Sequence, residues 1–546
     1  MFITNFSDID ETKIKSETLI EYLAFKKQNP DSIILIQIGT FFEAFCEDAK
    51  ILCETCNISA SSRPIKGIGQ VLQSGIPINS INFYIKLLIN NNYKVCICPQ
   101  FSENGQEYHR KLVRKYTKGT VIENEFLESG ENNYILALYK KDEKYYLSYA
   151  DVSTGQFYKT NTTNYNNIKT EADKISPSEL LILNSQANDF KEITIKYNTT
   201  YLYNQNSEIL DNDIEDIIIK YCKETQKNYA VKLNEVIEYK INQYLMMDEL
   251  TRINLELTRT KRLLKKKGSI LWFLNYTKTP MGTRLLKKIL SEPLLDVGLI
   301  KERQKAIKEL LDSKDNLKKL EEIMEKFCDL SRICAKISNS TILPKNLFIL
   351  AESLKTIETL DIITKNYSSK YIKINSLYLK QLQNLVEEIN SAILRNASED
   401  LKSGGIIKEG YDSNLDFLRE QNLNIENDIL KYEQQEIKTK NIDKLKIKYN
   451  AILGYFIEIP SSKQSLIPGN YVKVQALAHT IRYTTSTLKE FESKKSEIQY
   501  KINQLEYEIY CKIRNNAKSV VSIIRKLSDD IAKVDVFVSL SKCAII

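Results

Sequence analysis

Residues 446–460 read KIKYNAILGYFIEIP, and this stretch determines the architecture expected around it. The run from Ala451 to Pro460 is strand-like, with many β-branched and aromatic residues. A second short run of this kind follows at Tyr471 to Val474. The sequence therefore predicts a small β domain inside a part of the chain that is otherwise helical.

Heptad patterns flank this β segment on both sides. The first has Asn422 in one of its slots and the second has Lys495. The apolar positions are Leu415, Leu418, Ile425, Ile429 and Tyr432 before the segment, and Leu488, Phe491, Ile498, Ile502, Leu505 and Ile509 after it. Two such helices joined by a compact insert should pair antiparallel and carry the insert at their tip. A helix over residues 415–440 would be about 40 Å long at 1.5 Å per residue.

Positive charge is concentrated in the same region. Between Lys438 and Lys489 there are nine basic residues and two acidic ones, an excess of seven in a chain whose formal net charge is +8. Such a field suits a polyanion such as a nucleic-acid backbone. A solvated basic face or a protein-binding arm is the alternative interpretation.

The N-terminal part of the chain predicts a mixed α/β domain. A helical stretch runs from Glu17 to Gln28, and an apolar strand runs from Ile33 to Ile38 and ends at Gly39. The pattern then becomes helical, with one buried face formed by Phe42, Phe45, Ala49, Leu52 and Cys56. Phe41 lies outside that face, beside Glu43. It is either a local cap over the domain, which the sequence alone favours, or a side chain presented to a ligand.

A second small α/β domain is expected over residues 121–235. Its pattern is a hairpin from Tyr134 to Tyr139 and from Tyr145 to Asp151, with a charged turn at Lys140 to Lys144. A turn at residues 153–155 then leads into another strand. From about residue 236 to about residue 400 the chain is strongly helical.

Composition narrows the functional classes. With 546 residues and 42% hydrophobic residues, the chain should form about three to five domains. It has no apolar run of about 18 residues and no secretory signal pattern, so a soluble intracellular protein is expected. Ten irregularly spaced cysteines indicate reduced thiols. Cys53 and Cys56 with Cys96 and Cys98 could supply four thiolates to zinc, but buried small hydrophobic residues are the preferred interpretation.

Several motifs, in order along nearly the whole chain, resemble the MutS family of mismatch repair proteins. Gly39–Phe45 (GTFFEAF) is similar to the family motif G-x-F-Y-E-x-F, with Phe42 in place of the usual Tyr. The other matching stretches are Ser74–Pro77, Asn82–Tyr84, Thr279–Leu286, Pro293-Leu294, Glu302–Gln304, Gly410-Tyr411, Tyr449–Ala451 and Gly454–Ile459. The stretch around His479 departs from the family in detail.

The resemblance implies a multidomain α+β fold. Its parts would be a mixed α/β mismatch-recognition domain (1–120), a ribonuclease-H-like connector domain (121–235), a large α-helical core (236–411), a lever arm (412–440), a small β clamp domain (441–490) inserted between antiparallel arms, and the returning lever arm with core helices (491–546).

The resemblance also implies how such a protein would find a defect in duplex DNA. Phe41 would wedge into the minor groove and stack on a mispaired or unpaired base, and Glu43 would hydrogen-bond that base. Unstacking costs less at a defect than at a sound base pair, so the wedge would detect deformability. The side chains expected on the phosphate backbone are Lys446, Lys448, Asn450, Lys473, Arg482 and Tyr483.

MutS proteins also carry a C-terminal P-loop ATPase, and nothing in this sequence matches G-x-x-x-x-G-K-[ST]. We therefore expect no catalytic, ATP-binding or metal-binding residues and no cofactor in this chain. ATP, Mg²⁺, homodimerisation and a MutL-type repair partner are implied only for the intact family member, in the cytoplasm and associated with the nucleoid if prokaryotic. The chain could be a fragment, could work with a separately encoded ATPase module, or could bind DNA without one.

Two rival functions are open at this stage. Asp151, at a strand end, could belong to a nuclease that holds Mg²⁺ between carboxylates, although no convincing partner carboxylates are found. A MutS-like scaffold could bind branched or generic duplex DNA without mismatch preference, but relatives of that kind lack the Phe-x-Glu element present at Phe41 and Glu43.

Overall fold

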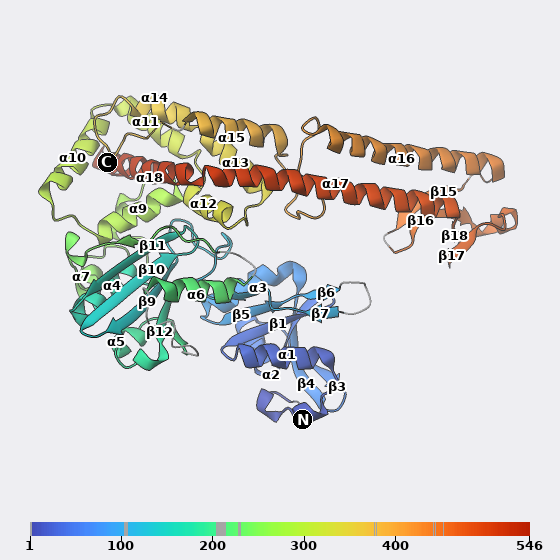
Figure 1. Ribbon diagram of the computed structural model, residues 1–546, viewed down its shortest axis with the longest axis horizontal. Coiled ribbons are helices and arrows are strands. Elements are labelled where there is room, and N and C mark those ends of the chain that lie inside the picture. The colour runs from blue at the N-terminus through green and yellow to red at the C-terminus, as the bar shows by residue number, and fades with distance from the viewer. Residues whose placement is uncertain are drawn as a thin grey trace. The chain divides into compact units, whose positions relative to one another are not determined.

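The computed structural model describes residues 3–102, 108–203, 214–227, 231–375, 377, 379–440, 442, 444–450 and 452–545 (Figure 1). The chain is a multidomain mixed α/β protein that divides into two compact units. Unit 1 comprises Met1–Ile342, Thr356–Leu379 and Val520–Ile546, and unit 2 comprises Leu343–Lys355 and Lys380–Ser519.

Unit 1 begins with a six-stranded sheet of order β3-β4-β2-β1-β5-β8. Each face of this sheet carries an apolar core. Helix α1 (Glu17–Gln28) packs on one face, and α2 (Cys46–Cys56) and α3 (Ile81–Asn90) pack on the other. The helix predicted at 17–28 and the strand predicted at 33–38 are both confirmed. The strands are β1 (Ser32–Ile38), β2 (Phe41–Phe45), β3 (Ser61–Ile65), β4 (Gly69–Pro77), β5 (Lys94–Cys98) and β8 (Arg114–Tyr116), and β6 (Gln100–Ser102) pairs with β7 (Tyr108–Arg110).

The helix predicted to start at Phe42 is wrong for its first turn. Residues 41–45 form strand β2, paired antiparallel with both β1 and β4, and the helix begins only at Cys46. Phe42 and Phe45 are buried as predicted, but on opposite faces of the sheet, because side chains alternate along a strand. Their spacing of three fits a helix equally well, and strand pairing decides the matter: β2 pairs with β1 just before it and with β4 further along the chain.

A second six-stranded sheet follows, of order β13-β12-β9-β10-β11-β14. The predicted hairpin is confirmed, with a tighter turn than expected, since β9 and β10 are joined at residues 142 and 143. The strands are β9 (Tyr134–Lys141), β10 (Lys144–Asp151), β11 (Gln156–Thr162), β12 (Glu179–Leu183), β13 (Thr199–Leu202) and β14 (Ile237–Glu238), and the helices are α4 (Tyr165–Ile175), α5 (Lys191–Thr194) and α6 (Glu215–Gln226).

Helices make up the rest of unit 1, around the C-terminal helix α18 (Val521–Ile545). Helix α18 packs against each of the helices from α8 to α12. The helices are α7 (Glu249–Asn254), α8 (Ile270–Leu274), α9 (Pro280–Ser291), α10 (Val297–Leu311), α11 (Lys314–Met324), α12 (Leu330–Ser338) and α14 (Ile357–Thr364).

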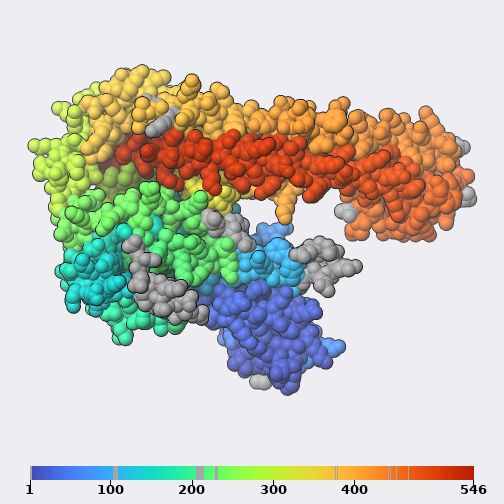
Figure 2. Space-filling view, in the orientation of Figure 1, coloured from blue at the N-terminus to red at the C-terminus, as the bar shows by residue number. Residues whose placement is uncertain are grey.

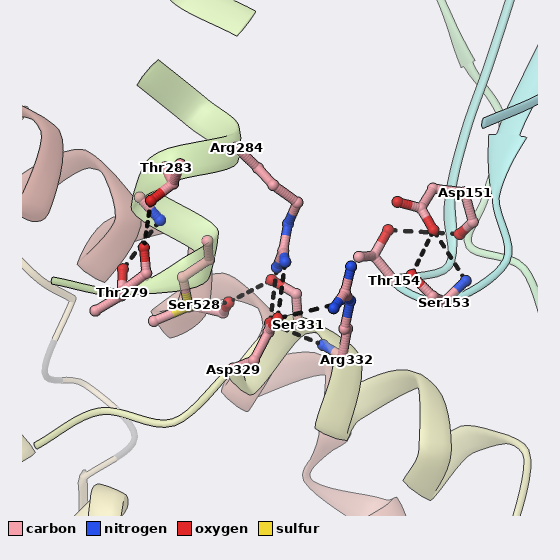
Figure 3. Close-up of polar contacts among 12 residues, drawn as sticks. Asp151, Ser153, Thr154, Thr279, Thr283, Arg284, Asp329, Ser331, Arg332 and Ser528 are labelled. Carbon is pink, nitrogen blue, oxygen red and sulfur yellow. Dashed lines mark hydrogen bonds and ion pairs between the residues drawn. The ribbon is translucent and has the colours of Figure 1, made fainter. Parts of the chain in front are cut away.

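Asp329 and two arginines form an ion-pair network between α9 and α12 (Figure 3), and one of these arginines also binds the loop that precedes the second sheet. Asp329 accepts two hydrogen bonds of 2.7 Å from the guanidinium of Arg284. Arg332, next to this pair, donates to the backbone carbonyls of Glu128 at 3.0 Å and Glu131 at 2.9 Å. These contacts tie α9 and α12 to residues 128–131.

Unit 2 is built on two long helices, α16 (Ser413–Lys440) and α17 (Ser486–Ser519), which pack against each other; in Figure 2 the orange surface of α16 lies beside the red surface of α17. The predicted helical hairpin with a β insert is confirmed. The insert is a four-stranded sheet of order β15-β16-β18-β17, with β15 (Lys446–Asn450), β16 (Gly454–Pro460), β17 (Val472–Ala476) and β18 (Thr480–Thr484). Two further helices are α13 (Pro344–Lys355) and α15 (Leu379–Ala392).

The run predicted as one strand over 451–460 is shorter than expected. Residues 452 and 453 form a turn and β16 begins at Gly454, whose φ of +68° suits a residue without a side chain. Ala451 lies outside the described residues.

Polar contacts occupy the two slots where the heptads lack an apolar residue. The side-chain amide of Asn422 donates to Gln499 at 3.3 Å, and Lys495 pairs with Glu426 at 2.5 Å and donates to the Tyr455 hydroxyl at 3.0 Å. These contacts join α16 to α17 and α17 to β16. Among the described residues, no helix combines the length and the hydropathy that a membrane span requires.

Candidate functional site

Phe41 stands at the start of β2, directly after the turn that joins it to β1. Gly39 adopts a φ of +60° in this turn, and Phe41 is then opposite Ile38 on one side and Pro77 on the other. The Phe41 side chain is 44% exposed, whereas Phe42 and Phe45 on the same strand are 6% and 1% exposed. Phe41 is therefore the phenylalanine of this strand that a ligand could reach.

Glu43 lies on the same face of β2 as Phe41, two residues further along. The residue opposite Glu43 on β4 is Gly75. A Cβ atom placed on Gly75 would lie 3.5 Å from Glu43 Cγ and 3.6 Å from Phe41 Cδ1. Both side chains therefore lie next to the backbone of β4 at Gly75, which has no side chain. This brings an exposed aromatic ring and a carboxylate together.

The Glu43 carboxylate is only partly accessible, and among the residues that the structure describes it has one ionic partner. Its Oε2 accepts a hydrogen bond of 3.0 Å from Nη1 of Arg63 on β3. Burial raises the pKa of Glu43 above its ordinary value, and the positive charges of Arg63 and, at longer range, Arg110 oppose that rise. The site thus holds a carboxylate that is harder to ionise than one in water.

The second group of predicted residues lies on the insert of unit 2. One face of its sheet packs on the ends of α16 and α17 through an apolar cluster that includes Ile457, Ile459 and Ile481. The register places Lys446 opposite Glu458, Lys448 opposite Phe456, and Glu458 opposite Arg482. Residues directly opposite each other share a face, so these cations lie on the face turned away from the helices.

The cations of this exposed face differ in their pairing. Glu458 binds Lys448 at 2.6 Å and Arg482 at 3.2 Å. These two partners, Lys448 first, hold the pKa of Glu458 below its ordinary value. The Arg482 guanidinium also stacks over the Phe456 ring at 4.6 Å. Contacts within the protein therefore already hold the side chains of Lys448 and Arg482 in place.

Lys446 and Lys473 are exposed, and neither side chain has an ion-pair or hydrogen-bond partner among the residues that the structure describes. Asn450 uses its side-chain oxygen to accept the backbone N–H of Ile452 at 2.8 Å and so shapes the β15–β16 turn. The structure does not bring Tyr483 to the exposed face. It is 5% exposed, belongs to the apolar cluster and packs against Tyr471.

The features that suggested a nuclease or a zinc site are structural. Asp151 is fully buried, and Oδ1 accepts the backbone N–H and the hydroxyl of Ser153 at 2.9 and 2.6 Å (Figure 3). Cys56 lies in the cluster on one face of the first sheet, and Cys96 and Cys98 lie in the cluster on the other. Burial raises the pKa of both Cys56 and Cys96 to about 11. No group of three possible metal ligands occurs among the described residues.

Sequence reasoning missed Arg63 and Gly75 as parts of the site around Glu43. Gly75 falls inside the Ser74–Pro77 motif, so its place in the pattern was visible although its role was not. Arg63 gave no comparable signal, because its link to Glu43 runs across the intervening strand β4.

Comparison with known proteins identifies the relatives of the chain. It matches MutS domain I over residues 18–125, MutS domain II over residues 133–236 and MutS domain III over residues 250–541. DNA mismatch repair protein MutS of Clostridium novyi (strain NT) is 33% identical over 553 residues, which cover 96% of this chain and 61% of that protein.

Two further relatives carry the same name. The protein of Caldanaerobacter subterraneus subsp. tengcongensis is 32% identical over 96% of this chain and 64% of its own length. That of Clostridioides difficile (strain 630) is 33% identical over 98% of this chain and 60% of its own length. The chain thus spans between 60% and 64% of the length of these relatives.

Proposed function

Because this chain belongs to the MutS family of DNA mismatch repair proteins, we propose that it binds duplex DNA at mismatched or unpaired bases. Phe41 enters the minor groove and stacks on the defective base, and Glu43 accepts a hydrogen bond from that base. The observation that carries this proposal is the exposure of Phe41 beside Glu43 over Gly75, on a strand whose other phenylalanines are buried.

The selectivity has a physical basis in the cost of unstacking. A wedge that separates two base steps pays a few kcal/mol at a sound pair and less at a mismatch or an unpaired base. A carboxylate among phosphates is unfavourable unless it finds a base N–H to accept, so Glu43 penalises intact duplex more than a defect. Phe41 supplies the insertion and Glu43 the discrimination.

The phosphate grip is assigned to the insert of unit 2 as a clamp on long arms. Its cations are Lys446, Lys448 and Arg482 on the exposed face and Lys473 on the edge strand β17, opposite Tyr483, and Asn450 orders the β15–β16 turn. Tyr483 stabilises the sheet from inside. We assign the remaining parts of the chain to the family's ribonuclease-H-like connector, helical core and levers.

ATP hydrolysis, homodimerisation and recruitment of a MutL-type partner are proposed only for a longer or multi-chain assembly. The residues present do not fit ATP with Mg²⁺, since the sequence has no G-x-x-x-x-G-K-[ST] and the described residues gather no metal-binding cluster. No step of the proposed recognition therefore uses nucleotide.

The test is a fluorescence-anisotropy titration at fixed salt with an intact duplex, the same duplex with one unpaired thymine, and a four-way junction. Wild type should prefer the unpaired thymine, and Phe41→Ala should lose that preference while it retains general DNA binding. Phe83→Ala is the matched control, because Phe83 is 62% exposed in the same domain but lies on α3. Equal binding to all three DNAs, or preference for the junction, would contradict the proposal and favour a generic or branched-DNA binder.

A further inference from the structure

The contact between Glu43 and Arg63 crosses a strand. Glu43 is on β2 and Arg63 is on the edge strand β3, with β4 between them. Along β4 the residue facing Glu43 is Gly75 and the residue facing Arg63 is Val71. Gly75 places no side chain beside Glu43, and the Arg63 guanidinium reaches the Glu43 carboxylate across β4 at 3.0 Å.

Arg63 is the direct countercharge of Glu43. The other cation that acts on Glu43, Arg110 of β7, is 8% exposed and already pairs with Glu21 at 2.8 Å while it donates to the Gln37 carbonyl. Arg63 itself is 41% exposed, and the described residues offer it no second acidic partner. The pair is therefore neutral as a unit and open to the surface.

Only one oxygen of the carboxylate is used by this contact. Oε2 receives the Arg63 hydrogen bond, and Oε1 has no hydrogen-bond partner among the residues that the structure describes. A carboxylate held at one oxygen by a bulky guanidinium presents the other in a restricted set of directions. Phe41 Cδ1 and Glu43 Cγ approach the same Gly75 position, so this carboxylate lies beside the wedge.

We propose that Arg63 is a positioning residue for defect recognition, which holds the Glu43 carboxylate beside Phe41 and cancels its charge while DNA approaches. This inference rests on the proposed roles of Phe41 and Glu43. The ion pair explains why a carboxylate is tolerated in a surface that meets phosphates, because the approaching duplex encounters a pair without net charge. A base N–H at a defect then binds the second oxygen without breaking the ion pair.

The consequence is a coupling between the two residues that a simple phosphate contact would not have. In Arg63→Gln the carboxylate loses its countercharge and its restraint, so affinity for the duplex with an unpaired thymine should fall about tenfold at pH 7.5. In a Glu43→Gln background, where no charge is left to cancel, the same substitution should cost no more than about threefold. Lys66→Gln, which removes an exposed cation from the same hairpin, should cost that smaller factor in both backgrounds.

The pH profile supplies a second readout. The neighbours of Glu43 on β1 and β4 are the uncharged Ile36 and Gly75, and the Asp48 carboxylate of α2 is held by Lys26 at 2.8 Å. Without Arg63, burial raises the pKa of Glu43 further, and bound phosphates raise it again. The affinity of Arg63→Gln should therefore recover as pH falls from 7.5 to 5.5, and Glu43→Gln should abolish that recovery.

The experiment is the double-mutant cycle of Arg63→Gln and Glu43→Gln, titrated on the unpaired-thymine and intact duplexes across this pH range, with Arg63→Lys as the charge-conserving rescue. Thermal melting establishes that each variant is folded, and Arg63→Met, which also removes the charge, replaces Arg63→Gln in the cycle if Arg63→Gln does not fold. Coupling of about tenfold, partial rescue by lysine and the pH-dependent recovery support the proposal. If wild type prefers the defect but Arg63→Gln lowers the affinity equally in both backgrounds and at every pH, this inference alone is overturned. If wild type shows no preference for the defect, the proposed function is overturned.

Discussion

Asp535 of α18 accepts a hydrogen bond of 2.6 Å from the hydroxyl of Thr279, although 256 residues separate them. The same carboxylate accepts the backbone N–H groups of Thr279 and Lys278, so it caps the N-terminus of α9 from another helix. Thr279 in turn accepts the N–H of Gly282 at 2.9 Å. The Thr279–Leu286 motif thus fixes α9 to the C-terminal helix.

Gly282→Ala should destabilise unit 1, because a Cβ atom there would lie 2.2 Å from Asp535 Oδ2 and 2.9 Å from Thr279 Oγ1. We expect a loss of about 2 kcal/mol in the free energy of unfolding, measured by urea denaturation. Gly469→Ala is the control, since that position has no atom within 4 Å and an ordinary backbone conformation. Equal stability of the two variants would contradict the capping arrangement.

Asp329→Asn should remove part of the acid sensitivity of the fold. Burial opposes ionisation of Asp329, but the two hydrogen bonds from Arg284 outweigh it, so the pKa of Asp329 lies below its ordinary value of 3.8. The ion pair therefore stabilises the folded state above about pH 4, and this contribution is lost as pH falls through the lower folded pKa.

The substitution also leaves the buried guanidinium of Arg284 without its partner, which costs about 3 kcal/mol at pH 7. Denaturation curves should show a constant gap between wild type and Asp329→Asn from pH 5 to pH 7, and a gap that narrows below pH 4. A gap that is independent of pH down to pH 2.5 would contradict the role given to the ion pair.

Lys446→Ala and Lys473→Ala should weaken binding to intact and mismatched duplexes by the same factor. Each removes one cation that has no partner among the described residues, so the slope of log affinity against log salt should become shallower by about 0.9 for each phosphate that is no longer neutralised. Lys501→Ala is the control, because Lys501 pairs with Glu497 on α17. A change in mismatch preference, or an unchanged slope, would place these lysines outside the phosphate grip.

Local patterns were sufficient to predict the elements whose periodicity is unambiguous. The helix from Glu17 to Gln28, the strand after it and the two heptad helices all appear where the sequence places them, because each buries one continuous face. The same patterns predicted the hairpin of long helices, because two helices that each have an apolar face and are joined through a compact insert can bury those faces against each other.

The parts that failed depend on distant partners. Residues 41–45 satisfy helical spacing, and they form a strand because they pair with β1 across the turn at residues 39 and 40 and with β4 some 30 residues later. Tyr483 could have been placed correctly from the alternation of Ile481, Arg482 and Tyr483, which puts arginine on one face and its neighbours on the other. The Glu43–Arg63 contact was beyond local reasoning, because it requires the register of three strands.

The point where the insert joins α16 and α17 makes the insert a structurally separable module. The chain leaves α16 and re-enters α17 side by side, where the Tyr432 and Thr485 hydroxyls lie 3.2 Å apart. The described part of the insert closes its own core on the ends of these helices through Ile442, Leu445 and Leu488. A short connector could bridge the two helices in its place, or the tip of another family member could be transplanted there. The DNA-binding surface proposed for the insert could then be exchanged between family members while the two long helices are kept.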